Sequence, residues 1–200
     1  MAFDGITLSG YVSSPDDFAV FPPVSERVIG RVLKMLSPYY APITLKMRMM
    51  NGIKDAIVED GITPEFDIRL IKSLKPAAYM IDGGDAYFSI GLLALKSPLA
   101  TLTVCLHELS HVILSRMEGY SSLKAVQREF RTSYGAHPSF DIMSPIELYA
   151  DLIAISILEC AYKATKKKKE KKRLLRAITH RREKLAAARS ALKTITTPIN

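Results

Sequence analysis

The chain has 200 residues, 48% of them hydrophobic, which is enough for one domain with a hydrophobic core and leaves little room for a second. Two cysteines are too few for a disulfide framework, so a disulfide-rich secreted domain is excluded and a reducing compartment is favoured. The chain start has no basic segment followed by an apolar run, and no stretch reaches about 18 uninterrupted apolar residues. We therefore expect a cytoplasmic protein without a membrane segment.

The net charge of +8 is unevenly distributed along the chain. Residues 163–193 hold 14 of the 28 Lys and Arg residues but only two of the 20 acids, Glu170 and Glu183, so this segment carries +12. The other 14 bases and 18 acids give the remainder −4. Any affinity for a polyanion is therefore expected from this basic tail alone.

A helix and a strand are predicted after a turn-rich start of 24 residues. Ser25 is a candidate N-cap for a helix with an apolar stripe formed by Val28, Ile29, Val32, Leu33 and Leu36. The segment ITLKMRMM, residues 43–50, alternates apolar side chains with Lys46 and Arg48. This period of two predicts a strand, which could offer an edge to an extended substrate.

A hairpin and further helices are predicted in the middle of the chain. Within residues 67–91, AAYMI and AYFSI flank the turn sequence DGGD. Ser-Pro at 97–98 then predicts the N-cap and first residue of a helix of about 20 residues. Residues 120–143 predict a short helix followed by a loop, and Ser-Pro at 144–145 begins another helix.

The stretch CLHELSHVILSRM carries two histidines four residues apart, with an acid beside the first. On a helix His107 and His111 project from the same face and can reach one metal ion. Glu108 lies about 100° further round and is placed to accept a proton from water. This HExxH pattern indicates a zinc site of the peptidase type.

A catalytic zinc ion needs a third protein ligand, and several residues are candidates. The extended HExxHxxGxxH pattern of metzincins is excluded because Leu114 and Met117 stand where glycine and histidine are required. His137 and Asp141 are candidates from the loop before the last helices. Glu147, near the start of the helix that begins at 144–145, is the favoured third ligand.

Glu147 has two competing interpretations. Asp151 follows it by one helical turn and could hydrogen-bond a ligating histidine, so the two acids suit a ligand and its supporting partner. However, Ser144 and Glu147 also form an S-x-x-E capping box, in which the glutamate binds the N-cap amide. The capping box leaves Asp151 unexplained in an apolar helix, which favours the ligand role.

HELSH, followed 36 residues later by ELYADLIAISIL, resembles the ImmA/IrrE-type metallopeptidases, whose second motif is a glutamate, two residues, an alanine and Asp or Asn. The resemblance covers about residues 70–160. It implies a gluzincin-like site with His107, His111 and Glu147 as Zn²⁺ ligands and Glu108 as general base. It also implies regulated cleavage of a regulatory or repressor protein.

Two further features are open to interpretation. Tyr134, His137 or Tyr149 could donate a hydrogen bond to the oxyanion formed in peptide hydrolysis. Residues 163–193 predict a basic helix with a thin apolar stripe that comprises Leu174, Ile178, Leu185, Ala188 and Leu192. This helix could form a coiled coil, dock on the domain, bind nucleic acid or an acidic protein, or remain solvated.

The expected fold is α+β: a small mixed or antiparallel sheet packed on the HExxH active-site helix and a second ligand-bearing helix, with a basic C-terminal helix. Residues 1–162 are expected to form a zincin-like metallopeptidase domain and residues 163–200 a basic helical extension. The expected function is a zinc-dependent endopeptidase that cleaves a protein substrate by Glu108-assisted attack of zinc-bound water. The alternative is a nucleic-acid- or protein-binding module that acts through the basic helix and keeps a structural or degenerate metal site.

Overall fold

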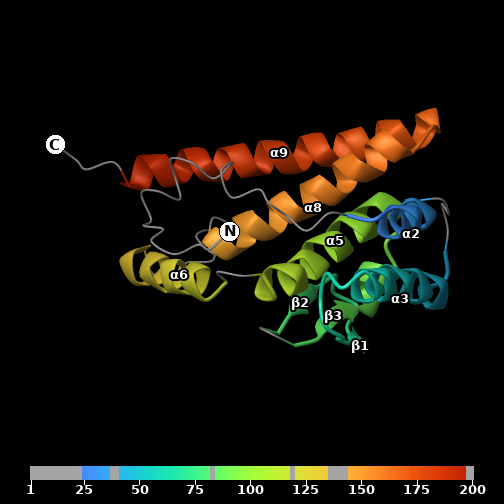
Figure 1. Cartoon of the computed structure of the whole chain (residues 1–200), viewed down its shortest axis with the longest axis horizontal. Helices are drawn as coiled ribbons and strands as arrows, with labels where there is room; N and C mark the ends of the chain where they lie inside the picture. Colours follow the sequence, from blue (N-terminus) through green and yellow to red (C-terminus); the bar gives the residue numbers. More distant parts are fainter. Residues whose placement is uncertain (1–23, 37–40, 82–83, 118–119, 135–143, 197–200) are drawn as a thin grey trace.

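A computed structural model describes residues 24–36, 41–81, 84–117, 120–134 and 144–196 (Figure 1). This part of the chain is mostly helical and contains a small mixed sheet of three strands, in agreement with the predicted α+β class. In chain order its elements are α2 (Glu26–Leu36), α3 (Ile43–Glu59), β1 (Ile68–Ile71), β2 (Ala78–Met80), β3 (Ala86–Ser89), α4 (Ile90–Leu93), α5 (Pro98–Ser115), α6 (Tyr120–Tyr134), α8 (Pro145–Ala164) and α9 (Lys168–Thr196).

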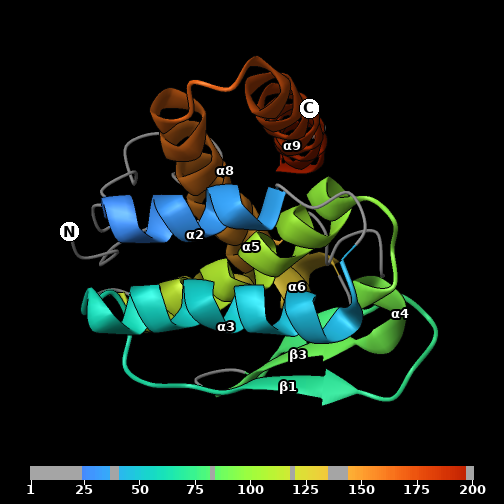
Figure 2. The same cartoon turned by 90° about the vertical axis from the view of Figure 1, so that its right-hand side faces the viewer.

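Helix α5 lies at the centre of the described structure. It contacts β2 and β3 on one side and α8 on the other, and α9 packs against both α8 and α5 (Figure 1). Helix α2 lies beside α3 and also contacts α5 and α8 (Figure 2). By length and composition α5 could cross a membrane, with a mean hydropathy of 1.2, but 67% of it is buried inside the protein. Packing by its neighbours therefore accounts for its apolar character.

The sheet has the strand order β1-β3-β2, so β2 is an edge strand. Strands β2 and β3 pair antiparallel with Ala78 opposite Phe88, which confirms the predicted hairpin, although two residues of its turn, 82–83, lie outside the described residues. Strand β1 joins β3 in parallel, so the sheet is mixed.

The predicted helix starts are confirmed where the structure describes them. Ser25 Oγ accepts a hydrogen bond from the Val28 amide at 3.2 Å, and Ser97 Oγ accepts one from the Ala100 amide at 3.2 Å. Each bond satisfies one amide that has no partner within its helix. The cap of α5 thus sets the start of the helix that carries both histidines.

The strand predicted at residues 43–50 is wrong, because this segment is the first half of helix α3. A short run in which apolar residues stand at nearly every second position fits both a strand and one face of a helix. The helix is stabilised by packing, mainly against α2 and also against α4 and β1, and its buried side chains stand at helical spacing, namely Lys46, Met50, Ile53, Ala56 and Ile57.

Lys46 shows the difference most clearly, since a strand would have placed it on the solvent face. It is only 6% exposed, and its Nζ donates to the carbonyl oxygens of Leu93 and Leu95, each at 2.6 Å. These carbonyls lie at the end of α4, where no helical amide is left to bind them. The substrate edge expected at residues 43–50 is therefore absent, and the described edge nearest the histidine helix is β2.

Helix α9 docks on the domain, which was one of the possibilities for the basic tail. The buried face of α9 belongs to the same core as α5 and α8 and comprises Leu174, Ala177, Ile178, Leu185 and Ala188. The side chain of Leu192 lies outside the described residues. Helix α8 runs to Ala164, so the predicted boundary between residues 162 and 163 falls inside a helix.

Candidate metal centre

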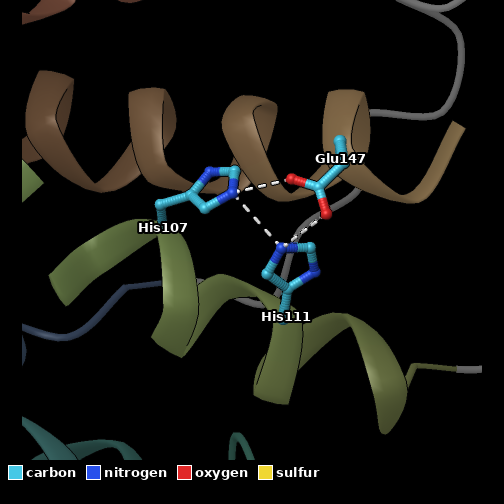
Figure 3. Close-up of side chains that lie close together, drawn as sticks. All are labelled: His107, His111 and Glu147. Atoms are coloured by element: carbon cyan, nitrogen blue, oxygen red, sulfur yellow. Dashed lines mark hydrogen bonds and ion pairs between the residues drawn. The ribbon is translucent and has the colours of Figure 1, made fainter. Parts of the chain in front are cut away.

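Three side chains that can ligate a metal meet where α5 lies against α8. His107 and His111 project from adjacent turns of α5, and Glu147 projects from the first turn of α8 (Figure 3). The Nε2 atoms of the histidines are 3.2 Å apart, and Glu147 Oε2 lies 2.9 Å from His107 Nε2. Glu147 Oε1 lies 3.3 Å from His111 Nε2, and the ligand atoms of all three residues lie within 4.8 Å of one another. This group can therefore hold a metal ion.

Asp151 contacts His107 through the ring nitrogen that faces away from the other two residues. It follows Glu147 by one turn on α8 and is only 4% exposed, and its Oδ1 lies 2.8 Å from His107 Nδ1. A proton held on Nδ1 by this carboxylate leaves the lone pair of Nε2 directed at the metal position. Helix α8 thus contributes both a candidate ligand and a carboxylate that contacts a second candidate ligand.

The acids and histidines of this group shift each other's pKa. Burial lowers the pKa of His107, but hydrogen bonds with Asp151 and Glu147 and their charges outweigh it and raise the pKa to about 9. Burial raises the pKa of Glu147, but hydrogen bonds from both histidines outweigh it and hold the pKa well below its usual range. These shifts favour a protonated His107 beside an ionised Glu147. A metal bound through Nε2 must displace that proton, so metal binding weakens as the pH falls.

Glu108 faces the cleft beside this group without being one of its three ligands. The cleft has a volume of about 610 Å³ and is lined by Glu108, His111 and Glu147, with walls from β2 and α6. Glu108 is 8% exposed, and burial raises its pKa. A carboxylate with a raised pKa is a stronger base, which suits a group that accepts a proton from water near neutral pH.

The capping box considered for Glu147 is absent. Ser144 is the N-cap of α8, but its side chain makes no capping hydrogen bond, and the Glu147 carboxylate faces the two histidines. Gln127 of α6 binds another amide of the first turn, because its Oε1 accepts a hydrogen bond from the Ile146 amide at 3.3 Å. One amide at the start of α8 is thus bound from another helix, and the Glu147 carboxylate faces the histidines.

The other candidate residues are not brought to the site by the described structure. His137 and Asp141 lie outside the described residues, as does the side chain of Tyr134. Tyr149 is fully buried in the core and does not line the cleft. An oxyanion donor is therefore not assigned among them.

Sequence reasoning missed Arg181, which connects α9 to the metal group. Arg181 is 8% exposed, and its Nη1 forms an ion pair with Asp151 while its Nη2 donates to the Thr103 carbonyl of α5. It occupies the position between Ile178 and Leu185 on the apolar stripe of α9. A charged residue at a core position of an amphipathic helix requires a buried partner, and that pattern could have revealed it.

Replacing Arg181 by methionine is expected to lower the affinity for a divalent metal by about 10- to 100-fold, because Asp151 would lose the partner that fixes it against His107. Competition with a chromophoric chelator measures this affinity. The matched control is Arg182→Met, since Arg182 is an exposed neighbour that pairs with Glu159. Equal metal affinity in both variants would show that Arg181 has only a packing role.

Comparison of the chain with protein-family models, with curated proteins and with solved structures gave no match.

Proposed function

We propose that this protein is a zinc-dependent endopeptidase. The observation that carries the proposal is the meeting of His107, His111 and Glu147 from two helices, with Glu108 facing the same cleft. Glu147 stands 36 positions after His111 in the sequence, so the HExxH spacing alone does not produce this convergence. In a peptidase of this kind, α5 and α8 serve as the active-site helices and the sheet as their support.

The donor set suits zinc. Two imidazole nitrogens and one carboxylate form the ligand set of many catalytic zinc sites, whereas Ca²⁺ and Mg²⁺ prefer oxygen ligands. The contact between Asp151 and His107 is the supporting interaction usual for a zinc-bound histidine. Bound there, zinc would supply a Lewis acid that polarises a carbonyl group and acidifies water.

Residues of the cleft carry out the proton transfer and hold the peptide. Glu108 accepts a proton from the attacking water and passes it to the amine that leaves when the peptide bond breaks. Strand β2 is an edge strand and lines the cleft through Ala78, Tyr79 and Met80. An extended peptide can pair with such an edge through backbone hydrogen bonds, which holds the scissile bond beside the metal group.

The resemblance of HELSH and ELYAD to the ImmA/IrrE-type metallopeptidases agrees with this proposal. A gluzincin-like arrangement assigns Glu147 as the third ligand, as the geometry favours. By the same resemblance, the proposed substrate is a regulatory or repressor protein in the cytoplasm. The peptidase activity that this resemblance implies is tested by measuring peptide cleavage.

Removal of the metal is expected to abolish cleavage of a degenerate peptide mixture, and one equivalent of zinc is expected to restore it. Mass spectrometry of the products, before and after dialysis against a chelator, measures this. Magnesium serves as the control ion, because the two histidines suit it poorly. A zinc-loaded protein that cleaves no peptide in the mixture would contradict the proposed function.

A second candidate function is supported by the outer face of α9. Helix α9 turns its apolar stripe to the core and exposes Lys168, Lys169 and Lys172 near its start, and Lys166 is exposed just before the helix begins. Such a face can bind nucleic acid phosphates or an acidic protein through charge. In that case the metal group would be structural or degenerate.

Replacing the lysines between positions 166 and 172 by glutamine is expected to weaken salt-dependent DNA or RNA binding by about tenfold or more, because fewer phosphates are neutralised. Gel-shift titrations at two salt concentrations measure this effect. Lysine-to-arginine replacements at the same positions keep the charge and serve as the control. Nucleic acid binding that is unchanged in the glutamine variant would eliminate this second function.

A further inference from the structure

One wall of the cleft beside the metal group is consistently basic. Helix α6 carries the charged residues Lys124, Arg128, Glu129 and Arg131 within its described part. The three bases line the cleft, whereas the acid does not. Their spacing of four and then three residues places them on one face of the helix. The side of α6 that a substrate would meet is therefore cationic.

Packing holds this face toward the cleft. The apolar side of α6 is buried through Leu123, Val126 and Phe130, and the helix contacts α8 near the start of that helix (Figure 1). The hydrogen bond from the Ile146 amide to Gln127 adds a polar link between α6 and α8. Like charges four residues apart repel each other on a helix, so the basic face does not follow from helix stability.

The charges of the cleft separate into two groups. The acids among its described lining residues are Glu108 and Glu147, and both are assigned to the proposed metal chemistry. A divalent ion at the centre would balance these two carboxylates. The Arg128 side chain is exposed and makes no hydrogen bond or ion pair with another described residue. It is therefore accessible to a ligand.

We propose that Arg128 binds a carboxylate of the peptide in the cleft and selects acidic substrates, and that the positive charges of Lys124 and Arg131 on the same wall add to the attraction. The proposal rests on the proposed peptidase function and adds a substrate class to it. Guanidinium groups suit this role because they bind a carboxylate through two parallel hydrogen bonds. The carboxylate comes either from an Asp or Glu side chain near the scissile bond or from a free C-terminus close to it, and the two sources share this chemistry.

The first experiment measures binding without turnover. Three fluorescently labelled peptides of equal length are titrated against the zinc-loaded Glu108→Gln variant: one rich in glutamate with an amidated C-terminus, its glutamine counterpart, and the glutamine peptide with a free C-terminal carboxylate. The glutamate peptide is expected to bind about tenfold more tightly than the glutamine peptide without a free C-terminal carboxylate at low salt. The difference is expected to be smaller at high salt. If only the free carboxylate strengthens binding, the C-terminus is the recognised group.

Introduction of Arg128→Glu into this variant is expected to remove the preference and to favour a lysine-rich peptide. The matched control is Lys72→Glu, which makes the same charge change at an exposed residue that neither lines the cleft nor belongs to α9. Zinc content and thermal melting verify that both proteins are folded and loaded. Equal affinity for all three peptides, or a preference that survives Arg128→Glu, would overturn the inference.

Cleavage of the same peptides by the zinc-loaded protein with Glu108 intact separates this inference from the proposed function. Cleavage with a preference for acidic peptides that is lost in Arg128→Glu supports both. Cleavage without such a preference overturns the inference and leaves the peptidase function standing. Binding that depends on Arg128 without any cleavage overturns the peptidase function and leaves the carboxylate-binding cleft standing.

Discussion

Replacing Glu108 by glutamine is expected to lower kcat/KM for peptide cleavage by a factor of about 10³, because general acid–base catalysis contributes on this scale. Glu108 is buried in the cleft beside His111 but is not one of the three clustered ligands. Glutamine keeps the volume of the side chain and cannot accept the proton from water. The zinc content and the melting temperature are therefore expected to remain those of the parent protein.

Quantitative mass spectrometry of the peptide products measures the rate in this experiment, and elemental analysis measures the zinc. The control is Glu129→Gln, since Glu129 is an exposed acid of α6 that does not line the cleft. A variant that retains more than about a tenth of the activity would remove Glu108 as the base. Loss of zinc from Glu108→Gln would instead indicate that Glu108 is a ligand.

Replacing Glu147 by alanine is expected to remove stoichiometric zinc, with an affinity at least about 100-fold weaker, which exceeds the loss expected for a supporting partner. Glu147 approaches both histidines, through Oε2 at 2.9 Å and Oε1 at 3.3 Å, and histidines alone would leave the ion with two protein ligands. The substitution also removes one of the carboxylates that raise the pKa of His107. Elemental analysis after gel filtration and chelator competition measure the affinity.

Two matched variants complete this test. Glu159→Ala removes another acid of α8, one that pairs with Arg182 on the surface, and is expected to leave zinc bound. His137→Ala addresses the alternative third ligand, which lies outside the described residues. A full equivalent of zinc in Glu147→Ala, together with loss of zinc in His137→Ala, would transfer the ligand role to His137.

Local features of the fold were predictable because they depend on residues close in sequence. Ser25 and Ser97 cap their helices through amides three residues ahead, and DGGD joins two strands that pair directly. The relation of His107 to His111 also follows from helical spacing alone. These features depend on contacts within one helix or one hairpin, and the described structure agrees with them.

Neighbouring residues alone do not decide the secondary structure of residues 43–50 or the role of Glu147. Apolar residues at 43–50 fit two periodicities, and packing of α3 against α2 selects the helix. Glu147 could serve as a cap or as a ligand, and the sequence does not reveal that Gln127 of α6 binds the amide of Ile146 instead. In both cases a partner distant in sequence decides between two local solutions of similar merit.

The sequence by itself determined the helix that carries both histidines of HExxH and placed Asp151 one turn beyond Glu147 as a candidate partner for one of them. Only the tertiary structure decided that α8 brings Glu147 to the histidines, that α6 supplies a basic wall, and that Arg181 of the tail reaches Asp151. The physical reason is that these contacts join helices far apart in the chain. Their approach is set by burial of apolar faces, which specifies neighbours only when the whole core is assembled.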